Sequence, residues 1–141
     1  MTINQISVFV ENKPGALAQI ASELVAGGVN LRALSIAETH DFGVLRFIAD
    51  NEDNAVKILR EAGHVLSLTP VLAVVLKDEP GSFAATLGIL AAEGIDVEYT
   101  YAFLTPKAHT ACMIFRVADN EKAAAVLRAA GVNLATKEEM E

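Results

Sequence analysis

Asn12-Lys13-Pro14-Gly15 recurs as Asp78-Glu79-Pro80-Gly81, at an offset of 66 in the numbering, and each copy follows an apolar run and opens a helix-like stretch. The same offset relates other pairs along the chain, namely Val8 and Val74, Leu24 and Leu90, Gly28 and Gly94, and Asn30 and Asp96. It increases to 69 at the sequence Ala-Asp-Asn-Glu, which occupies residues 49–52 and 118–121. The chain is therefore a tandem duplication, and we expect three extra residues in one hairpin of the second copy. A period this long indicates two small domains, which we place at residues 1–68 and 69–141, and not a solenoid.

Within each copy, segments whose apolar residues recur every two residues, as in strands, alternate with segments whose apolar residues recur about every 3.6 residues, as in helices. The order of these segments is the same in both copies. In the first copy we expect strands over residues 6–10, 31–38, 44–49 and 65–68, with helices over 17–25 and 55–62. In the second copy we expect strands over 72–76, 97–103 and 110–117 and near Val132, with helices over 83–91 and 123–130. This βαββαβ order predicts an α+β fold of two ferredoxin-like units in tandem, each with two helices on one face of an antiparallel sheet.

The Pro-Gly turn of the first copy is the main candidate binding site. Pro14 suits the first helical position, which makes Lys13 the cap residue without a capping side chain. The N–H groups of Gly15, Ala16 and Leu17 then face whatever occupies the turn. A helix N-terminus of this kind favours an anion such as a carboxylate. Alternatively, the turn has only a structural role, with Asn12 or water satisfying these N–H groups.

Asn30 is a second candidate, because it follows the glycines that end the first helix. If sheets pair edge to edge, its side chain could lie beside a neighbouring helix start. An amide offers both a donor and an acceptor, which suits a ligand that carries a carboxylate and an ammonium group. Asparagine after Gly-Gly is also ordinary turn chemistry, so a structural role remains open.

Val10-Glu11-Asn12-Lys13-Pro14-Gly15-Ala16-Leu17 and Gly28-Val29-Asn30-Leu31, on a βαββαβ frame, resemble the ACT domain. This regulatory module typically binds amino acids, and the whole chain resembles stand-alone tandem ACT proteins. The resemblance implies a ligand site at an interface between ACT domains. Amino-acid-binding relatives use two asparagines, which match Asn12 and Asn30 here. Together with the turn, this leads us to expect ligand binding at Asn12, Lys13, Pro14, Gly15, Ala16, Leu17, Asn30 and Leu31. Some relatives place a histidine two residues before the first asparagine, where this chain has Val10, so the ligand contacts are not fully reproduced.

The second copy departs further from that pattern, because Asp78 and Asp96 replace the two asparagines. Two carboxylates would repel a ligand carboxylate. We therefore expect the first copy to bind the carboxylate. Three roles stay open for the second copy: it supplies a carboxylate that faces an ammonium group, it binds a cation, or it acts only as a scaffold. Its weaker candidate residues are Asp78, Pro80, Gly81, Ser82, Phe83 and Asp96.

Charge and composition limit the partners. The formal net charge is −7 and the isoelectric point is about 4.9, which disfavours nucleic-acid binding. No apolar run approaches the roughly 18 residues that span a bilayer. Cys112 is the only cysteine, and no basic-then-apolar leader opens the sequence, so we expect the cytoplasm. The mean hydropathy of +0.37 leads us to expect apolar contacts between subunits and at least a homodimer.

Catalytic and metal-ligating candidates are weak. His40 with Asp41, and His109 with Cys112, lie at or near the two hairpins, but two ligands do not make a closed zinc site, and we expect neither a metal nor a cofactor. No known nucleotide-binding or nucleophile motif occurs, so we expect no enzymatic activity. The sequence predicts a regulatory protein that binds a small amino acid or a similar carboxylate metabolite. Two alternatives stay open, an assembly module without a ligand and a small ferredoxin-like enzyme.

Overall fold

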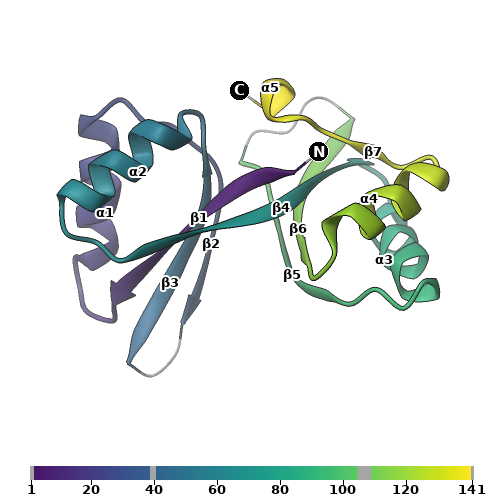
Figure 1. The fold of residues 1–141 in the computed structure, drawn as a ribbon, viewed down its shortest axis with the longest axis horizontal. Coiled ribbons are helices and arrows are strands. Elements are labelled where there is room, and N and C mark those ends of the chain that lie inside the picture. Colours follow the sequence, from purple (N-terminus) through teal and green to yellow (C-terminus); the bar gives the residue numbers. More distant parts are fainter. Residues whose placement is uncertain (1, 39–40, 105–108, 141) are drawn as a thin grey trace. The chain divides into compact units, whose positions relative to one another are not determined.

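The computed structural model describes residues 2–38, 41–104 and 109–140 of the 141-residue chain. These residues form two compact units, one made of Asn4–Thr69 and the other of the remainder of the chain (Figure 1). Each unit contains two main helices and an antiparallel sheet, so the predicted α+β fold with ferredoxin-like repeats is confirmed.

The first unit contains β1 (Ile3–Glu11), α1 (Ala16–Ala26), β2 (Leu31–Glu38), β3 (Phe42–Ala49), α2 (Glu52–Glu61) and the beginning of β4 (Leu66–Lys77). Its strand order is β2-β3-β1-β4. Both helices cover one face of the sheet, because the core includes Ile6, Ile20, Phe47 and Leu59 from β1, α1, β3 and α2. The apolar stripe of α1 is narrower than the sequence suggests: Ile20 and Leu24 are buried, whereas Leu17 and Val25 are exposed.

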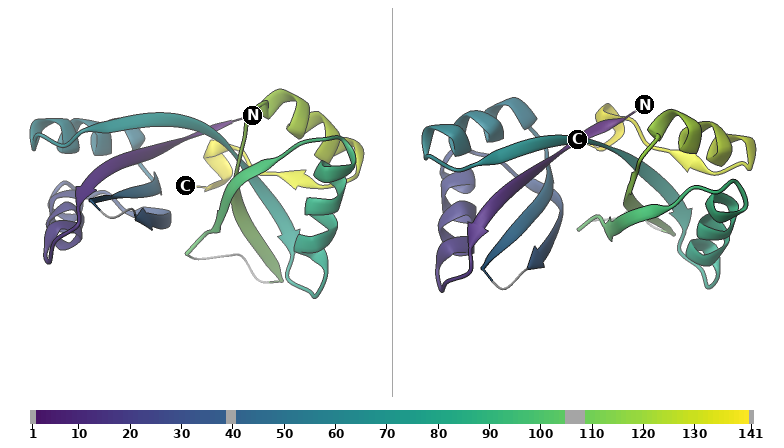
Figure 2. Two further views of the ribbon diagram at one scale, coloured as in Figure 1. Left: turned by 90° about the horizontal axis from the view of Figure 1, so that it is seen from below. Right: turned by 60° about the horizontal axis from the view of Figure 1, so that its bottom comes forward.

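The second unit repeats this plan with β4, α3 (Ser82–Ala92), β5 (Val97–Ala102), β6 (Thr110–Val117), α4 (Asn120–Ala129) and β7 (Asn133–Leu134). Its strand order is β5-β6-β4-β7, and α3 and α4 pack on the same face of the sheet (Figure 2). The chain ends in the short helix α5 (Lys137–Met140), whose residues 137–139 are exposed. The Thr136 hydroxyl begins that helix by accepting a hydrogen bond from the amide of Glu139 at 3.3 Å.

The two separate strands expected over residues 65–68 and 72–76 are one continuous strand. β4 runs for 12 residues through Pro70. Proline suits extended backbone, and Pro70 precedes the residues that pair with β6, which begin at Leu72, so its missing N–H removes no bond of that ladder. β4 is the final strand of the first sheet and a central strand of the second.

The expected insertion of three residues is wrong by one. Ile6 pairs with Phe47 in the first unit and Leu72 pairs with Phe115 in the second, so β6 follows β3 at an offset of 68. The helix caps Asn51 and Asp119 have the same offset. The repeated Ala-Asp-Asn-Glu is therefore not aligned in space, and the second hairpin is longer by two residues. Strand pairing and not residue identity sets the register, so the two copies of this tetrapeptide are not structural equivalents.

Candidate functional site

The turn between β1 and α1 is a type II turn. Gly15 has φ 87° and ψ −11°, and the amide of Ala16 donates to the carbonyl of Lys13 at 3.3 Å. A type II turn favours proline at its second position and requires a positive φ, hence glycine, at its third. Pro14 and Gly15 occupy those two positions. The prediction that Pro14 is the first helical residue and Lys13 the cap is therefore wrong: Gly15 is the cap, and α1 begins at Ala16.

The second unit has the same turn. Gly81 has φ 90° and ψ −14°, and the amide of Ser82 donates to the carbonyl of Glu79 at 3.4 Å. The repeated Pro-Gly sequence therefore specifies the same backbone conformation in both copies.

The turn leaves amide donors at the start of α1, although not all of those predicted. The first helical bond runs from the amide of Gln19 to the carbonyl of Gly15 at 3.0 Å. Among the described residues, the amides of Leu17 and Ala18 have no hydrogen-bond acceptor. The amide of Ala16 was expected to be free, but it bonds to Lys13. The donors available to an anion on α1 are thus those of Leu17 and Ala18.

A pocket of about 250 Å³, which we call the turn pocket, lies beside this turn. Part of its wall comes from other strands, namely Ile36 and Glu38 of β2 and Gly43 of β3. These wall residues were missed by the sequence analysis. Their common face could have been predicted from the strand periodicity, because alternate residues of a strand lie on the same face. Leu34, Ile36 and Glu38 alternate in this way, and Leu34 pairs with the core residue Phe47. The pocket is lined by Val10, Glu11, Asn12, Lys13, Pro14, Gly15, Leu17, Ile36, Glu38 and Gly43.

The predicted residues of the first copy are not all in one place. Five of them line the turn pocket, namely Asn12, Lys13, Pro14, Gly15 and Leu17, and Ala16 does not. Asn30 and Leu31 lie beyond the other end of α1, whose 11 residues span about 16 Å. There the backbone of Asn30 exchanges two 3.0 Å hydrogen bonds with Asp50, one of them through the Asp50 carboxylate. One unit therefore does not bring Asn12 and Asn30 together, and their joint role across units stays a prediction.

The second-copy candidates occupy the corresponding positions. Pro80, Gly81, Ser82 and Phe83 form the turn and the beginning of α3, and Asp96 directly precedes β5. The amide of Asp78 donates to the carbonyl of His109 at 3.0 Å. The Phe83 ring packs edge-on against Phe115 with centroids 6.1 Å apart. The residue that corresponds to Glu38 is Leu104, at the offset of 66, so this end of the second unit lacks that carboxylate.

Two of the titratable groups outside the turn are paired with each other, and a third is largely buried. The Glu23 carboxylate lies 2.7 Å from Nε2 of His64. Burial raises the pKa of the Cys112 thiol to about 11, which makes it a poor nucleophile. No group of three or more potential metal ligands occurs in the described ranges, and His40 lies outside them. In the same ranges, no helix is long and apolar enough to cross a membrane.

Comparisons with known proteins extend over the whole chain. The family model described as "ACT domain pair" matches residues 1–141. A crystal structure of a protein from Bacteroides thetaiotaomicron has a TM-score of 0.92 at 34% identity, over 99% of this chain and 96% of that one. The ligand-free regulatory subunit of aspartate kinase from Thermus thermophilus has a TM-score of 0.67 at 19% identity, over 91% and 89% of the two chains. The regulatory subunit of aspartate kinase from Thermus flavus has a TM-score of 0.65 at 17% identity, over 91% and 90%. A search of curated proteins found no match.

Proposed function

Since this chain belongs to the family of ACT domain pairs, we propose that it is a non-enzymatic regulatory protein that binds an amino acid or a similar carboxylate metabolite in the turn pocket. The similar fold of the aspartate kinase regulatory subunits is consistent with a regulatory role. We propose further that it acts in the cytoplasm as a homodimer or a higher homo-oligomer, in which a neighbouring unit completes the site with Asn30 and Leu31.

The observation that carries this proposal is the pocket beside the type II turn. Leu17 lines the pocket and its amide lacks an acceptor among the described residues, so a ligand carboxylate has a donor at the positive end of the α1 dipole. Gly15 has no side chain to obstruct its approach, and a Cβ built there meets no atom within 4 Å. The Lys13 ammonium adds a positive charge, although Glu11 already pairs with it at 2.9 Å.

The part of the pocket lining that comes from β2 supplies the complementary charge. Glu38 lies at the end of β2 and lines the same pocket, where its carboxylate would attract an ammonium group. Ile36 is 49% exposed and offers an apolar surface for a side chain. An amide donor and a carboxylate that line the same pocket suit a zwitterion better than a simple anion. An amino acid is therefore the preferred ligand class.

A thermal-shift screen of the twenty amino acids tests the proposal. A ligand that binds only the folded protein raises Tm in proportion to the logarithm of its concentration above Kd. We expect Glu38→Gln to reduce the shift caused by the best amino acid and to leave the response to its deaminated analogue unchanged. Glu93→Gln, an exposed substitution at the end of α3, is the control.

Two outcomes would contradict the proposal. If no amino acid and no carboxylate analogue changes Tm, the chain is an assembly module without a ligand. If Glu93→Gln reduces the shift as much as Glu38→Gln does, the ligand does not contact the turn pocket.

A further inference from the structure

A second and larger pocket, of about 430 Å³, lies on the first unit between α1 and the segment that links α2 to β4. We call it the link pocket. One of its ends is apolar: Phe9, Phe42 and Val65 line it and are 50%, 40% and 64% exposed. The two rings meet edge to face with centroids 5.6 Å apart. Large apolar side chains gathered at one exposed place are typical of a binding surface.

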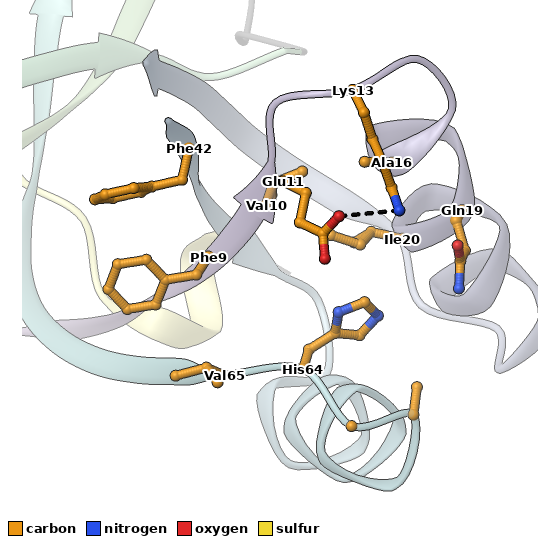
Figure 3. Close-up of a pocket in the computed structure, with 12 residues that line it drawn as sticks. Phe9, Val10, Glu11, Lys13, Ala16, Gln19, Ile20, Phe42, His64 and Val65 are labelled. Carbon is orange, nitrogen blue, oxygen red and sulfur yellow. Dashed lines mark ion pairs between the residues drawn. The ribbon is translucent and has the colours of Figure 1, made fainter. Parts of the chain in front are cut away.

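The other end of the link pocket is polar. Glu11 and Lys13 form an ion pair there at 2.9 Å, and Gln19 and His64 lie beside it (Figure 3). The imidazole of His64 is held by Glu23, which lies outside the pocket lining. Figure 3 shows Phe9, Phe42 and Val65 at one end and the charged pair at the other. The pocket therefore combines an apolar body with a polar end that carries both signs of charge.

The Glu11–Lys13 pair can be opened by a ligand. Its side chains are 76% and 64% exposed, and exposed ion pairs contribute little to stability. A zwitterion can place its ammonium on Glu11 and its carboxylate on Lys13, so that neither protein charge loses its partner. A ligand with a single charge would leave one member of the pair without a counter-charge.

We propose that the link pocket binds an amino acid with a large apolar side chain, which packs on Phe9, Phe42 and Val65 while its zwitterionic end replaces the Glu11–Lys13 contact. The volume is within the usual range for small-molecule sites. Val10, Glu11 and Lys13 line both pockets, whereas Phe9, Phe42 and Val65 line only the link pocket.

The second unit does not reproduce this site. At the established offsets, Phe9, Phe42 and Val65 correspond to Val75, Thr110 and Asn133. Two of the three apolar groups are replaced by polar ones, and the aromatic pair is lost. The proposal therefore assigns one link pocket to each chain.

The test is an NMR titration of the full chain, labelled at the Ile, Leu and Val methyl groups, with L-phenylalanine. The methyl groups of Val65 report on the link pocket, and those of Leu17 and Ile36 report on the turn pocket. We expect saturable shifts at Val65.

A substitution at Val65 measures what the apolar end contributes. Val65→Ser should weaken binding about five- to ten-fold, because a buried methyl contact is lost. In that variant the methyl groups of Ile20, which also lines the link pocket, report on binding. Val25→Ser is the matched control: Val25 is 74% exposed on the same unit and lines neither pocket.

Charge recognition is tested with 3-phenylpropionate and phenethylamine, which keep the ring and carry only one of the two charges. We expect each to bind about two- to five-fold more weakly than phenylalanine, because one contact to an exposed member of the ion pair is lost. Three results would overturn the inference: no saturable shift at Val65, an equal loss of affinity in Val25→Ser, or equal affinity for the three compounds. Shifts confined to Leu17 and Ile36 would also overturn it, while supporting the function proposed for the turn pocket.

Discussion

Nε2 of His64 lies 2.7 Å from Oε2 of Glu23, and this contact joins the segment that follows α2 to the middle of α1. The two side chains are only 19% and 21% exposed. Oε1 of the same carboxylate accepts a hydrogen bond from Gln19 at 3.1 Å. In the second unit the corresponding residues are Ile89 and Val132, which are partly buried against the core. The two copies therefore differ at these positions: the first has a polar contact between Glu23 and His64, and the second has two apolar residues packed against its core.

This difference leads to a prediction for stability. His64→Val should lower the free energy of unfolding by about 1–2 kcal/mol, because the largely buried Glu23 carboxylate loses its imidazole partner. The double variant Glu23→Ile with His64→Val should recover most of that loss, because it restores the apolar pair of the second unit. Urea denaturation of the two variants measures both effects. A double variant that is less stable than His64→Val alone would contradict this interpretation of the contact.

The same chemical change should have opposite effects at two glycines. Gly15→Ala should destabilise the protein by about 1 kcal/mol, because alanine resists the φ of 87° required by the type II turn. Gly88→Ala, inside α3, should stabilise it by about 0.5–1 kcal/mol, because alanine is the better helix former. A Cβ has open space at both sites, so steric contact does not enter. Equal effects in urea denaturation would show that backbone conformation is not the deciding factor.

The caps of α2 and α4 test the offset that relates the later elements of the two copies. Asn51 accepts a hydrogen bond from the amide of Asn54 at 3.1 Å, and Asp119 accepts one from Lys122 at 3.1 Å. Asn51→Ala and Asp119→Ala should each cost about 1 kcal/mol of stability, the usual effect of removing an N-cap. Lys57→Ala, at an exposed position of α2, is the control and should change little. A negligible effect of Asp119→Ala would argue against this cap and against the offset.

The Cys112 thiol should react slowly with iodoacetamide. Burial raises its pKa to about 11, so roughly one thiol in a thousand is ionised at pH 8, against about a quarter for an ordinary cysteine. The reaction rate should keep rising through pH 10. The unfolded chain releases this proton at lower pH than the folded chain does, so stability should fall as the pH rises from about 9 towards 11. A rate that reaches its plateau near pH 9, as with a free thiol control, would contradict the raised pKa.

The fold was largely readable from the sequence because local and global signals agree in it. The repeat aligned Leu24 with Leu90 and Gly28 with Gly94, and the structure buries both leucines and gives both glycines a positive φ. The later elements are related by an offset of 68, and not by the 69 of the repeated tetrapeptide, because strand pairing and not residue identity sets the register. In the same way, Pro14 is compatible both with a helix start and with a type II turn, and only the backbone conformation distinguishes the two.

The candidate site was only partly predictable. Asn12 to Gly15 are local in sequence, and they line the turn pocket as one segment. Glu38 comes from another strand and reaches the pocket through the pairing of β2 with β3. The link pocket depends on Phe42 and Val65, which are distant from Phe9 in the sequence and come from other elements of the unit. Such non-local groupings follow from topology, and no short motif in the chain identifies them.

β4 has a consequence for how such a protein could be divided. A cut at the boundary between Thr69 and Pro70 would divide a single strand and leave each fragment with only part of it. The two duplicated units share this strand, so neither unit can be removed without taking away part of it. A truncated version that keeps one copy should therefore retain the whole of Leu66–Lys77.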